Sequence, residues 1–273
     1  MTQRYERRAT LIKIEGMHAE RGDRLVLRDI DVEVKDIVRP DVADQGQVVG
    51  VLGPSGAGKT TLLRVLAGLD APSRGRVRIG ESLEPVRAGM VGVVFQNYPL
   101  FEHRRVLGNL VVAARRTGAG DGETRARALL DRFGLGDRAD AWPGELSGGQ
   151  RQRVAILPQL LCGHTYLVMD EPFSGLDPIS KQHACELIAE VARMDERNTI
   201  VIVTHDVREA VKVSDTLWLI GREVAPSGEP VPGNRIVQTY DLIERDLAWQ
   251  PGIERTPEFD AFVREVEDRF RTL

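Results

Sequence analysis

The chain has 273 residues, of which 42% are hydrophobic and 29% charged, as in a soluble globular protein of one large domain or two small ones. The formal net charge of −4 argues against a general surface for nucleic acids or anionic membranes. Two cysteines are too few for a disulfide framework, and no apolar run approaches the about 20 residues that span a bilayer.

The first predicted elements are two strands, over residues 9–14 and 25–34, because both segments alternate apolar and polar side chains. Residues 35–45 break this alternation with charges and Pro40, which predicts a loop. The apolar run over 47–52 then predicts a buried strand that leads into a glycine-rich segment.

That glycine-rich segment reads GPSGAGKT and fits the phosphate-binding P-loop pattern G-x-x-x-x-G-K-[ST]. A strand precedes it and a predicted helix over 61–67 follows, so backbone N–H groups and a helix N-terminus can face a polyphosphate. Lys59 is expected to reach the β- and γ-phosphates, and the Thr60 hydroxyl to reach Mg²⁺. The predicted nucleotide-binding residues of this segment are Gly53, Pro54, Ser55, Gly56, Ala57, Gly58, Lys59, Thr60 and Thr61.

Further strands are predicted at 75–79 and 91–95, and again at Val168, 200–203 and 217–220. Helix-rich sequence over about 96–164, broken at 117–122, separates the two groups, and a helix over 181–194 lies between two of the later strands. Alternating strands and helices indicate an α/β fold with a mainly parallel sheet.

Two later segments carry polar groups that suit nucleotide chemistry. In LSGGQRQR, over 146–153, Ser147 can cap a helix while Gly148 and Gly149 allow a phosphate to approach, although an ordinary capped surface helix explains this segment equally well. An apolar strand then ends in Asp170 and Glu171, where a parallel sheet commonly places a metal site.

Taken together, the chain resembles the nucleotide-binding subunit of an ATP-binding cassette (ABC) transporter over about residues 11–221. The family's motifs occur in the family's order: the P-loop 53–60, the glutamine loop with Gln96, the signature 146–150, the Walker B strand 166–170 followed by Glu171, the D-loop 174–177 and the switch histidine His205. The resemblance implies a P-loop NTPase core with N-terminal antiparallel strands over residues 9–222, a helical subdomain over about 96–165 and a tail over 223–273.

The resemblance also implies a mechanism in which two cassettes bind ATP head to tail. Glu171 would be the general base, His205 would contact the γ-phosphate, and Thr60, Gln96 and Asp170 would hold Mg²⁺. The implied catalytic residues are Glu171, His205 and Gln96, and the implied contacts to the opposite subunit's nucleotide and site are Ser147, Gly148, Gly149 and Asp177.

The implied partners are a second ATPase subunit, transmembrane permease subunits and an extracytoplasmic solute-binding protein, with no nucleic acid, at the cytoplasmic face of the cell membrane. The overall length of the chain and its short tail resemble those of importer ATPases for nitrate, sulfonate or taurine. Import of an amino acid is the alternative function. A soluble ABC ATPase of translation or repair would carry paired cassettes, coiled-coil arms or iron–sulfur cysteines, which this chain does not show. The intact Lys59, Asp170, Glu171 and His205 argue against a nonhydrolytic binding module.

The chain departs from the family in two places. Residues 16–23 hold no aromatic side chain to stack on adenine, so either Arg21 or His18 stacks on the base or both are solvated. After the signature helix, Pro158 is expected to kink or end the helix.

The tail contains an irregular proline- and glycine-rich connector over 226–233 and a second helix start. Thr256, Pro257 and Glu258 supply an N-cap, a first-turn proline and an early acid. The apolar residues at 259, 262, 263, 266 and 270 share one helical face, which predicts a helix packed on its own domain; a docking or regulatory helix is the alternative.

Overall fold

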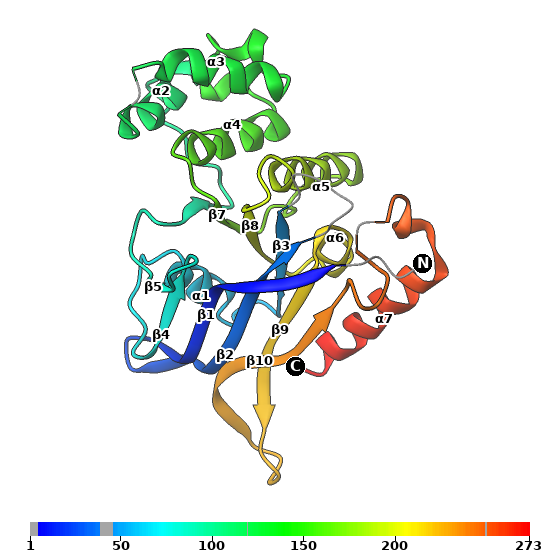
Figure 1. The fold of residues 1–273 in the computed structure, drawn as a ribbon. Helices are drawn as coiled ribbons and strands as arrows, with labels where there is room; N and C mark the ends of the chain where they lie inside the picture. Colours follow the sequence, from blue (N-terminus) through cyan, green and yellow to red (C-terminus); the bar gives the residue numbers. More distant parts are fainter. Residues whose placement is uncertain (1–4, 39–45, 119, 249) are drawn as a thin grey trace.

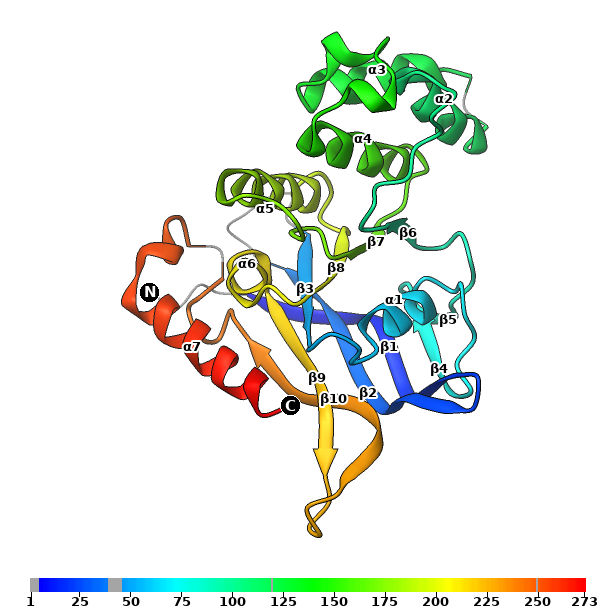
Figure 2. The same cartoon turned by 180° about the vertical axis from the view of Figure 1, so that it is seen from behind.

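The computed structural model describes residues 5–38, 46–118, 120–248 and 250–273 as one curled sheet with helices on both faces and a helical lobe at one end (Figures 1 and 2). The strands are β1 Glu6–Arg21, β2 Arg24–Val38, β3 Gln47–Leu52, β4 Arg74–Ile79, β5 Glu84–Pro85, β6 Gly92–Val94, β7 Tyr166–Asp170, β8 Thr199–Thr204, β9 Thr216–Val224 and β10 Pro230–Asp241. The helices are α1 Lys59–Leu66, α2 Val106–Arg116, α3 Gly122–Arg132, α4 Gly148–Leu161, α5 Pro178–Ala192, α6 Val207–Val213 and α7 Pro257–Arg271, with short 3₁₀ helices at Gly136–Arg138, Pro143–Glu145 and Ile253–Arg255.

The sheet order is β5-β4-β1-β2-β10-β9-β3-β8-β7-β6. From β6 to β9 the strands are parallel, and every residue of β3 and β8 is buried. Their side chains alternate between two cores: Val49 and Val51 pack on the α1 side, whereas Val48 and Leu52 belong to the core with α5, α6 and α7. Helices on both faces explain why these strands read as continuous apolar runs, and the predicted parallel α/β core is confirmed.

The predicted N-terminal strand pair is also confirmed, but it is longer than the alternating pattern indicated. β1 pairs antiparallel with β2 along its length, from Glu6 opposite Val38 to Arg21 opposite Arg24. The prediction of a loop is therefore wrong for residues 35–38, because the partner strand continues there and Ile37 is buried in the core. The rest of that predicted loop, 39–45, lies outside the described residues.

The prediction of an irregular connector after residue 225 is wrong from Pro230 onward, where β10 begins and pairs antiparallel with β9. On the side of β10 that faces β2, the two strands pair at Asn234 opposite Leu27. The segment with Pro230 and Pro232 therefore needs few backbone hydrogen bonds to β2, and prolines are tolerated there. The division predicted between a domain over 9–222 and a tail over 223–273 stays a prediction, and the β9–β10 hairpin spans it.

The helical lobe, residues 96–165, contains α2, α3 and α4 and stands beyond one end of the sheet (Figure 1). Within it, α4 continues past Pro158 to Leu161, so the predicted end at this proline is wrong; a kink stays a prediction. The proline lies in the last turn, where it removes one backbone donor while its own carbonyl accepts from the Cys162 N–H at 3.1 Å. The helix therefore loses little by continuing.

The predicted tail helix is confirmed as α7, which begins after Thr256, whose hydroxyl accepts from the Phe259 N–H at 3.3 Å. Its apolar face packs on the domain itself: Phe259 and Val266 are fully buried, and the Phe262 ring meets the Tyr240 ring edge-on at 5.3 Å between centroids. The helix is thus part of the fold's own core.

Because Phe259 is fully buried, Phe259→Ala should lower the free energy of unfolding by about 3–5 kcal/mol through lost burial and a new cavity. The matched control is Phe101→Ala, whose ring is 50% exposed and should cost much less. Urea denaturation followed by circular dichroism measures both. Equal losses in the two variants would show that α7 adds no more stability than a surface aromatic.

Candidate functional site

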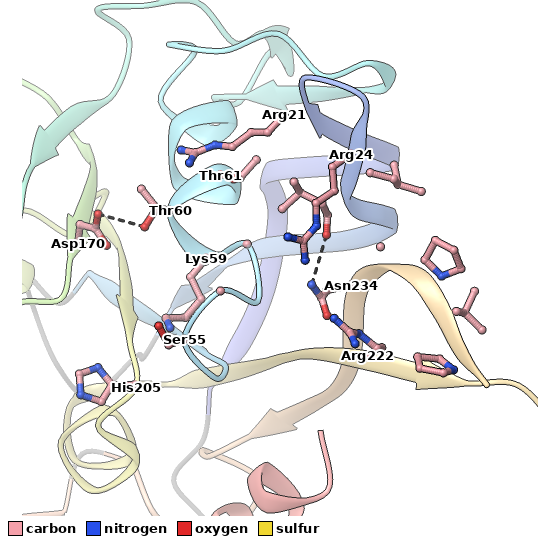
Figure 3. Close-up of a pocket in the computed structure, with 18 of the residues that line it drawn as sticks. Arg21, Arg24, Ser55, Lys59, Thr60, Thr61, Asp170, His205, Arg222 and Asn234 are labelled. Carbon is pink, nitrogen blue, oxygen red and sulfur yellow. Dashed lines mark hydrogen bonds between the residues drawn. The ribbon is translucent and has the colours of Figure 1, made fainter. Parts of the chain in front are cut away.

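A cavity of about 1110 Å³ opens at the carboxyl ends of β3, β7 and β8, beside the N-terminus of α1 (Figure 3). It is lined by three groups of residues: Ser55, Gly56, Gly58, Lys59, Thr60 and Thr61; Gln96, Asp170, Glu171 and His205; and Arg21, Asp23, Arg24, Leu25, Val26, Arg222, Pro230, Val231, Pro232, Gly233 and Asn234. The first two groups were predicted from motifs far apart in sequence, and the fold brings them together.

The phosphate-binding loop has backbone that only glycine adopts easily. Gly58 precedes α1 with φ of 93°, and a Cβ there would lie 2.8 Å from a Leu27 carbon and 2.9 Å from Val26 Cγ1. No side chain caps α1, so its first N–H groups are left for another acceptor, as an anion site at a helix N-terminus requires. The loop thus requires glycine at this position and lies close against β2, which fixes its backbone beside the cavity.

Lys59 is buried at the base of this loop. Its Nζ donates to the Gly53 carbonyl at 2.8 Å and to the Pro54 carbonyl at 3.3 Å, and it lies 3.6 Å from Glu171 Oε1. Burial lowers the pKa of Lys59, and the neighbouring Glu171 carboxylate opposes that shift. The ammonium is therefore held in place by groups that a phosphate can replace or supplement.

Oxygen ligands suited to a hard cation gather beside the loop. The Thr60 hydroxyl donates to Asp170 Oδ2 at 3.4 Å, while the Gln96 amide donates to the Ser174 hydroxyl at 3.1 Å. Burial, with the Glu171 charge beside it, raises the pKa of Asp170, so a cation there would relieve an unfavourable negative charge. One hydroxyl, one carboxylate and one amide match the few protein ligands that Mg²⁺ takes when it also binds phosphate and water.

Glu171 is positioned by both its backbone and its carboxylate. Its backbone is left-handed, with φ of 49°, and its N–H donates to the Val203 carbonyl at 2.7 Å. Its Oε2 accepts from the Thr204 hydroxyl at 3.0 Å and lies 2.9 Å from His205 Nδ1. A left-handed backbone and a carboxylate whose Oε2 is held by hydrogen bonds while the side chain lines the cavity are the arrangement expected of a positioned base.

The structure does not bring the signature residues to this cavity. Ser147, Gly148 and Gly149 lie at the start of α4 in the helical lobe, and none of them lines the cavity. The Ser147 hydroxyl instead accepts from the Gln150 N–H at 3.3 Å, and the Gln150 side chain accepts from the Ser147 N–H at 3.0 Å. This capped, exposed helix start leaves its glycines open to another molecule.

Asp177 is also outside the cavity, at the N-terminus of α5. Its carboxylate accepts from the N–H groups of Ile179 and Ser180 at 2.9 and 3.1 Å, and the Ser180 hydroxyl bond holds the pKa of Asp177 below its usual range. Its position is thus set by helix capping.

Sequence reasoning missed much of the far end of the cavity. Arg21 does line it, but His18 does not; His18 Nε2 lies 3.0 Å from Asp29 Oδ1. The sequence does not single out Arg24, Arg222 or the β10 residues 230–234 as site residues. They line the same cavity because β10 pairs between β2 and β9. The missing aromatic at 16–23 was the sequence signal that could have directed attention there.

Comparison with known proteins gives a consistent result. Residues 42–174 match the family described as ABC transporter. The aliphatic sulfonates import ATP-binding protein SsuB 2 of Pseudomonas aeruginosa is 38% identical over 214 residues, which cover 78% of this chain and 73% of that protein. The glutamate transport ATP-binding protein GluA of Corynebacterium glutamicum is 38% identical over 232 residues, which cover 81% and 91% of the two chains.

Solved structures share the fold. CbiO1 of Clostridium perfringens, described as part of the ABC transporter complex CbiONQ, superposes with a TM-score of 0.71 at 24% identity and covers 95% of this chain and 100% of its own. The ATP-binding cassette MJ0796, solved as a dimer bound to ADP and phosphate, superposes with a TM-score of 0.67 at 23% identity, covering 85% and 99% of the two chains.

Proposed function

The chain belongs to the ATP-binding subunits of ABC transporters, and we propose that it powers the import of a small organic anion of the sulfonate class. The observation that carries the ATPase assignment is the convergence of Lys59, Asp170, Glu171 and His205 on one cavity at the carboxyl edge of the sheet. The anion class is supported by the sulfonate importers among the relatives.

Each residue has a role that its position supports. The N–H groups of the loop before α1 and the Lys59 ammonium would hold the β- and γ-phosphates. Thr60, Gln96 and Asp170 would hold Mg²⁺, which would offset phosphate charge. Glu171 orients the attacking water and accepts its proton, and His205 donates toward the γ-phosphate.

We propose that Ser147, Gly148 and Gly149 bind the nucleotide of a second copy of the chain, with Asp177 at the junction between the two sites. This proposal is supported by their exposure at helix starts remote from their own cavity. ATP would then bridge two copies, and its hydrolysis would release them.

No helix in the described part of this chain is long and apolar enough to cross a membrane. We propose that the chain works with transmembrane permease subunits. We propose that its contact is the exposed aromatic pair Phe101 and Trp142 of the helical lobe, which are 50% and 42% exposed. Arg104 and Arg105 lie over these two rings, at 5.9 and 5.0 Å from the guanidinium carbon to the ring centroid. The contact would place the chain at the cytoplasmic face of the membrane, and a solute-binding protein would complete the importer.

Replacing both aromatics, as Phe101→Ser with Trp142→Ser, should release the subunit from membranes that contain its permease while ATPase activity of the purified chain stays unchanged. The reason is that both rings are exposed and neither lines the nucleotide cavity. Membrane flotation with immunoblotting measures the release, with Val224→Ser, an exposed residue at the end of β9, as control. Membrane retention equal to wild type would place the permease contact elsewhere.

The identity of the transported substrate is tested by measuring uptake into cells. Cells that lack this chain should lose uptake of radiolabelled taurine or an alkanesulfonate, and Lys59→Ala should fail to restore it where wild type succeeds. Amino-acid import is the second candidate, because the glutamate and L-cystine import ATP-binding proteins are also relatives, at 38% and 33% identity. Loss of glutamate or cystine uptake with sulfonate uptake intact would favour that alternative.

A further inference from the structure

The end of the cavity away from Lys59 is built by segments outside the part of the chain that matches the family, residues 42–174. Two segments meet there: the β1–β2 turn with Arg24, and the β9–β10 hairpin with Arg222 and Asn234 (Figure 3). Because the phosphates of a bound nucleotide lie at the loop with Lys59, this opposite end would receive the base.

This end of the cavity, called the base end below, contains Arg24, Arg222 and Asn234 and is fixed to the phosphate-binding loop through short contacts. Asn234 pairs with Leu27 on β2 and with Arg222 on β9, so it joins the two strands. Its Nδ2 donates to the Val26 carbonyl at 3.4 Å, and Val26 in turn packs against Gly58. The hairpin is therefore positioned by the same strand that positions the phosphate loop.

The polar groups of the base end are mainly unpaired cations. Within the described residues, Arg24 and Arg222 have no ion-pair partner, whereas the nearby Arg28 and Arg235 pair with Glu223 at 2.7 and 3.4 Å. No Phe, Tyr or Trp side chain of the described residues lines the cavity, and the imidazole of His205 belongs to the group with Glu171. A guanidinium offers a flat face for stacking and five N–H donors but no acceptor.

We propose that Arg24 and Arg222 hold the purine base of the bound nucleotide, and that the site accepts GTP at least as well as ATP. The proposal rests on the nucleotide site proposed above. A guanidinium can stack on either base, but its donors match the two neighbouring acceptors of guanine, O6 and N7. Adenine presents a donor, N6–H₂, beside its N7 acceptor, a pair that guanidinium donors alone do not match. One N–H of the Asn234 amide is directed to the Val26 carbonyl, at 3.4 Å.

Asp23, on the same turn as Arg24, adds a carboxylate to the lining. A carboxylate accepts from N–H groups, and guanine carries two of them, N1–H and N2–H₂, on one edge. The acid and the two arginines therefore favour the same base.

Competition against a fluorescent ATP analogue in the presence of Mg²⁺ tests the proposal on the purified full-length chain, with ATP, GTP and inorganic triphosphate as competitors. In the wild type, GTP should bind as tightly as ATP or more tightly. Arg24→Ala and Arg222→Ala should each weaken ATP about threefold to fivefold and GTP about tenfold, with triphosphate unchanged. Arg235→Ala, the matched control on the same hairpin, should change none of the three.

Arg24→Lys and Arg222→Lys keep the charge but lose the flat fork, so they should weaken GTP binding about as much as the alanine variants and keep the triphosphate affinity. They also replace an alanine variant that does not fold. A wild-type affinity for GTP about threefold or more below that for ATP would overturn the proposal. So would an equal loss of triphosphate and nucleotide affinity in the arginine variants, since that indicates general attraction of anions. In either case Lys59→Ala would still abolish triphosphate binding; if it did not, the nucleotide site itself would be wrong.

Discussion

Glu171→Gln should leave ATP binding intact and lower steady-state hydrolysis by about 10²- to 10⁴-fold, because the amide cannot accept the proton of the attacking water. The side-chain oxygen can still accept from the Thr204 hydroxyl, which donates to Glu171 at 3.0 Å in the native protein, so the loop should keep its conformation. The uncleaved ATP should also trap a dimer. Phosphate release measures the turnover, and light scattering measures the mass.

The matched control for this variant is Glu258→Gln, which changes an exposed acid on α7, outside the nucleotide cavity. It should hydrolyse ATP at the wild-type rate and should not accumulate as a dimer. Turnover of Glu171→Gln close to that of the control would remove Glu171 from the role of base.

Mixed dimers with Lys59→Ala on one copy and Ser147→Arg on the other should retain more ATP binding than either mutant homodimer. Lys59 lines its own chain's cavity, whereas Ser147 lies on the helical lobe outside that cavity. If Ser147 acts on the other copy's nucleotide, as proposed, the two changes meet at one of the two sites. The second site keeps its native composition. Each homodimer, in contrast, carries a lesion at both sites.

Differently tagged copies, purified in sequence, isolate the mixed dimer, and equilibrium binding of ATP measures its stoichiometry. The expected value is about one ATP per mixed dimer, from the one intact site. The control is a mixed dimer in which one copy carries both Lys59→Ala and Ser147→Arg and the other copy is wild type, since this arrangement places one lesion at each of the two sites. Equal ATP affinity and equal dimerisation in the mixed dimer and the two mutant homodimers would show that the signature does not act across the interface.

The sequence by itself determined the features that short contiguous segments encode. The loop with Lys59, the cap at Ser147 and the apolar face of α7 each depend on residues within a few positions of one another, because glycine conformation, helix capping and helical periodicity are local. The parallel core was predictable for a related reason. Strands buried on both faces are apolar throughout, and such runs recur at β3, β7 and β8.

The tertiary structure alone decided which residues line the end of the cavity away from Lys59. Arg24 and Arg222 are far apart in the chain and carry no motif; they line one cavity only because β10 is inserted between β2 and β9 and Asn234 joins both strands. The same holds for residues 35–38, whose charged sequence indicates a loop but which pair with β1 as a strand. Strand pairing between distant segments is set by the packing of the whole sheet, and a short stretch of sequence does not record its partner.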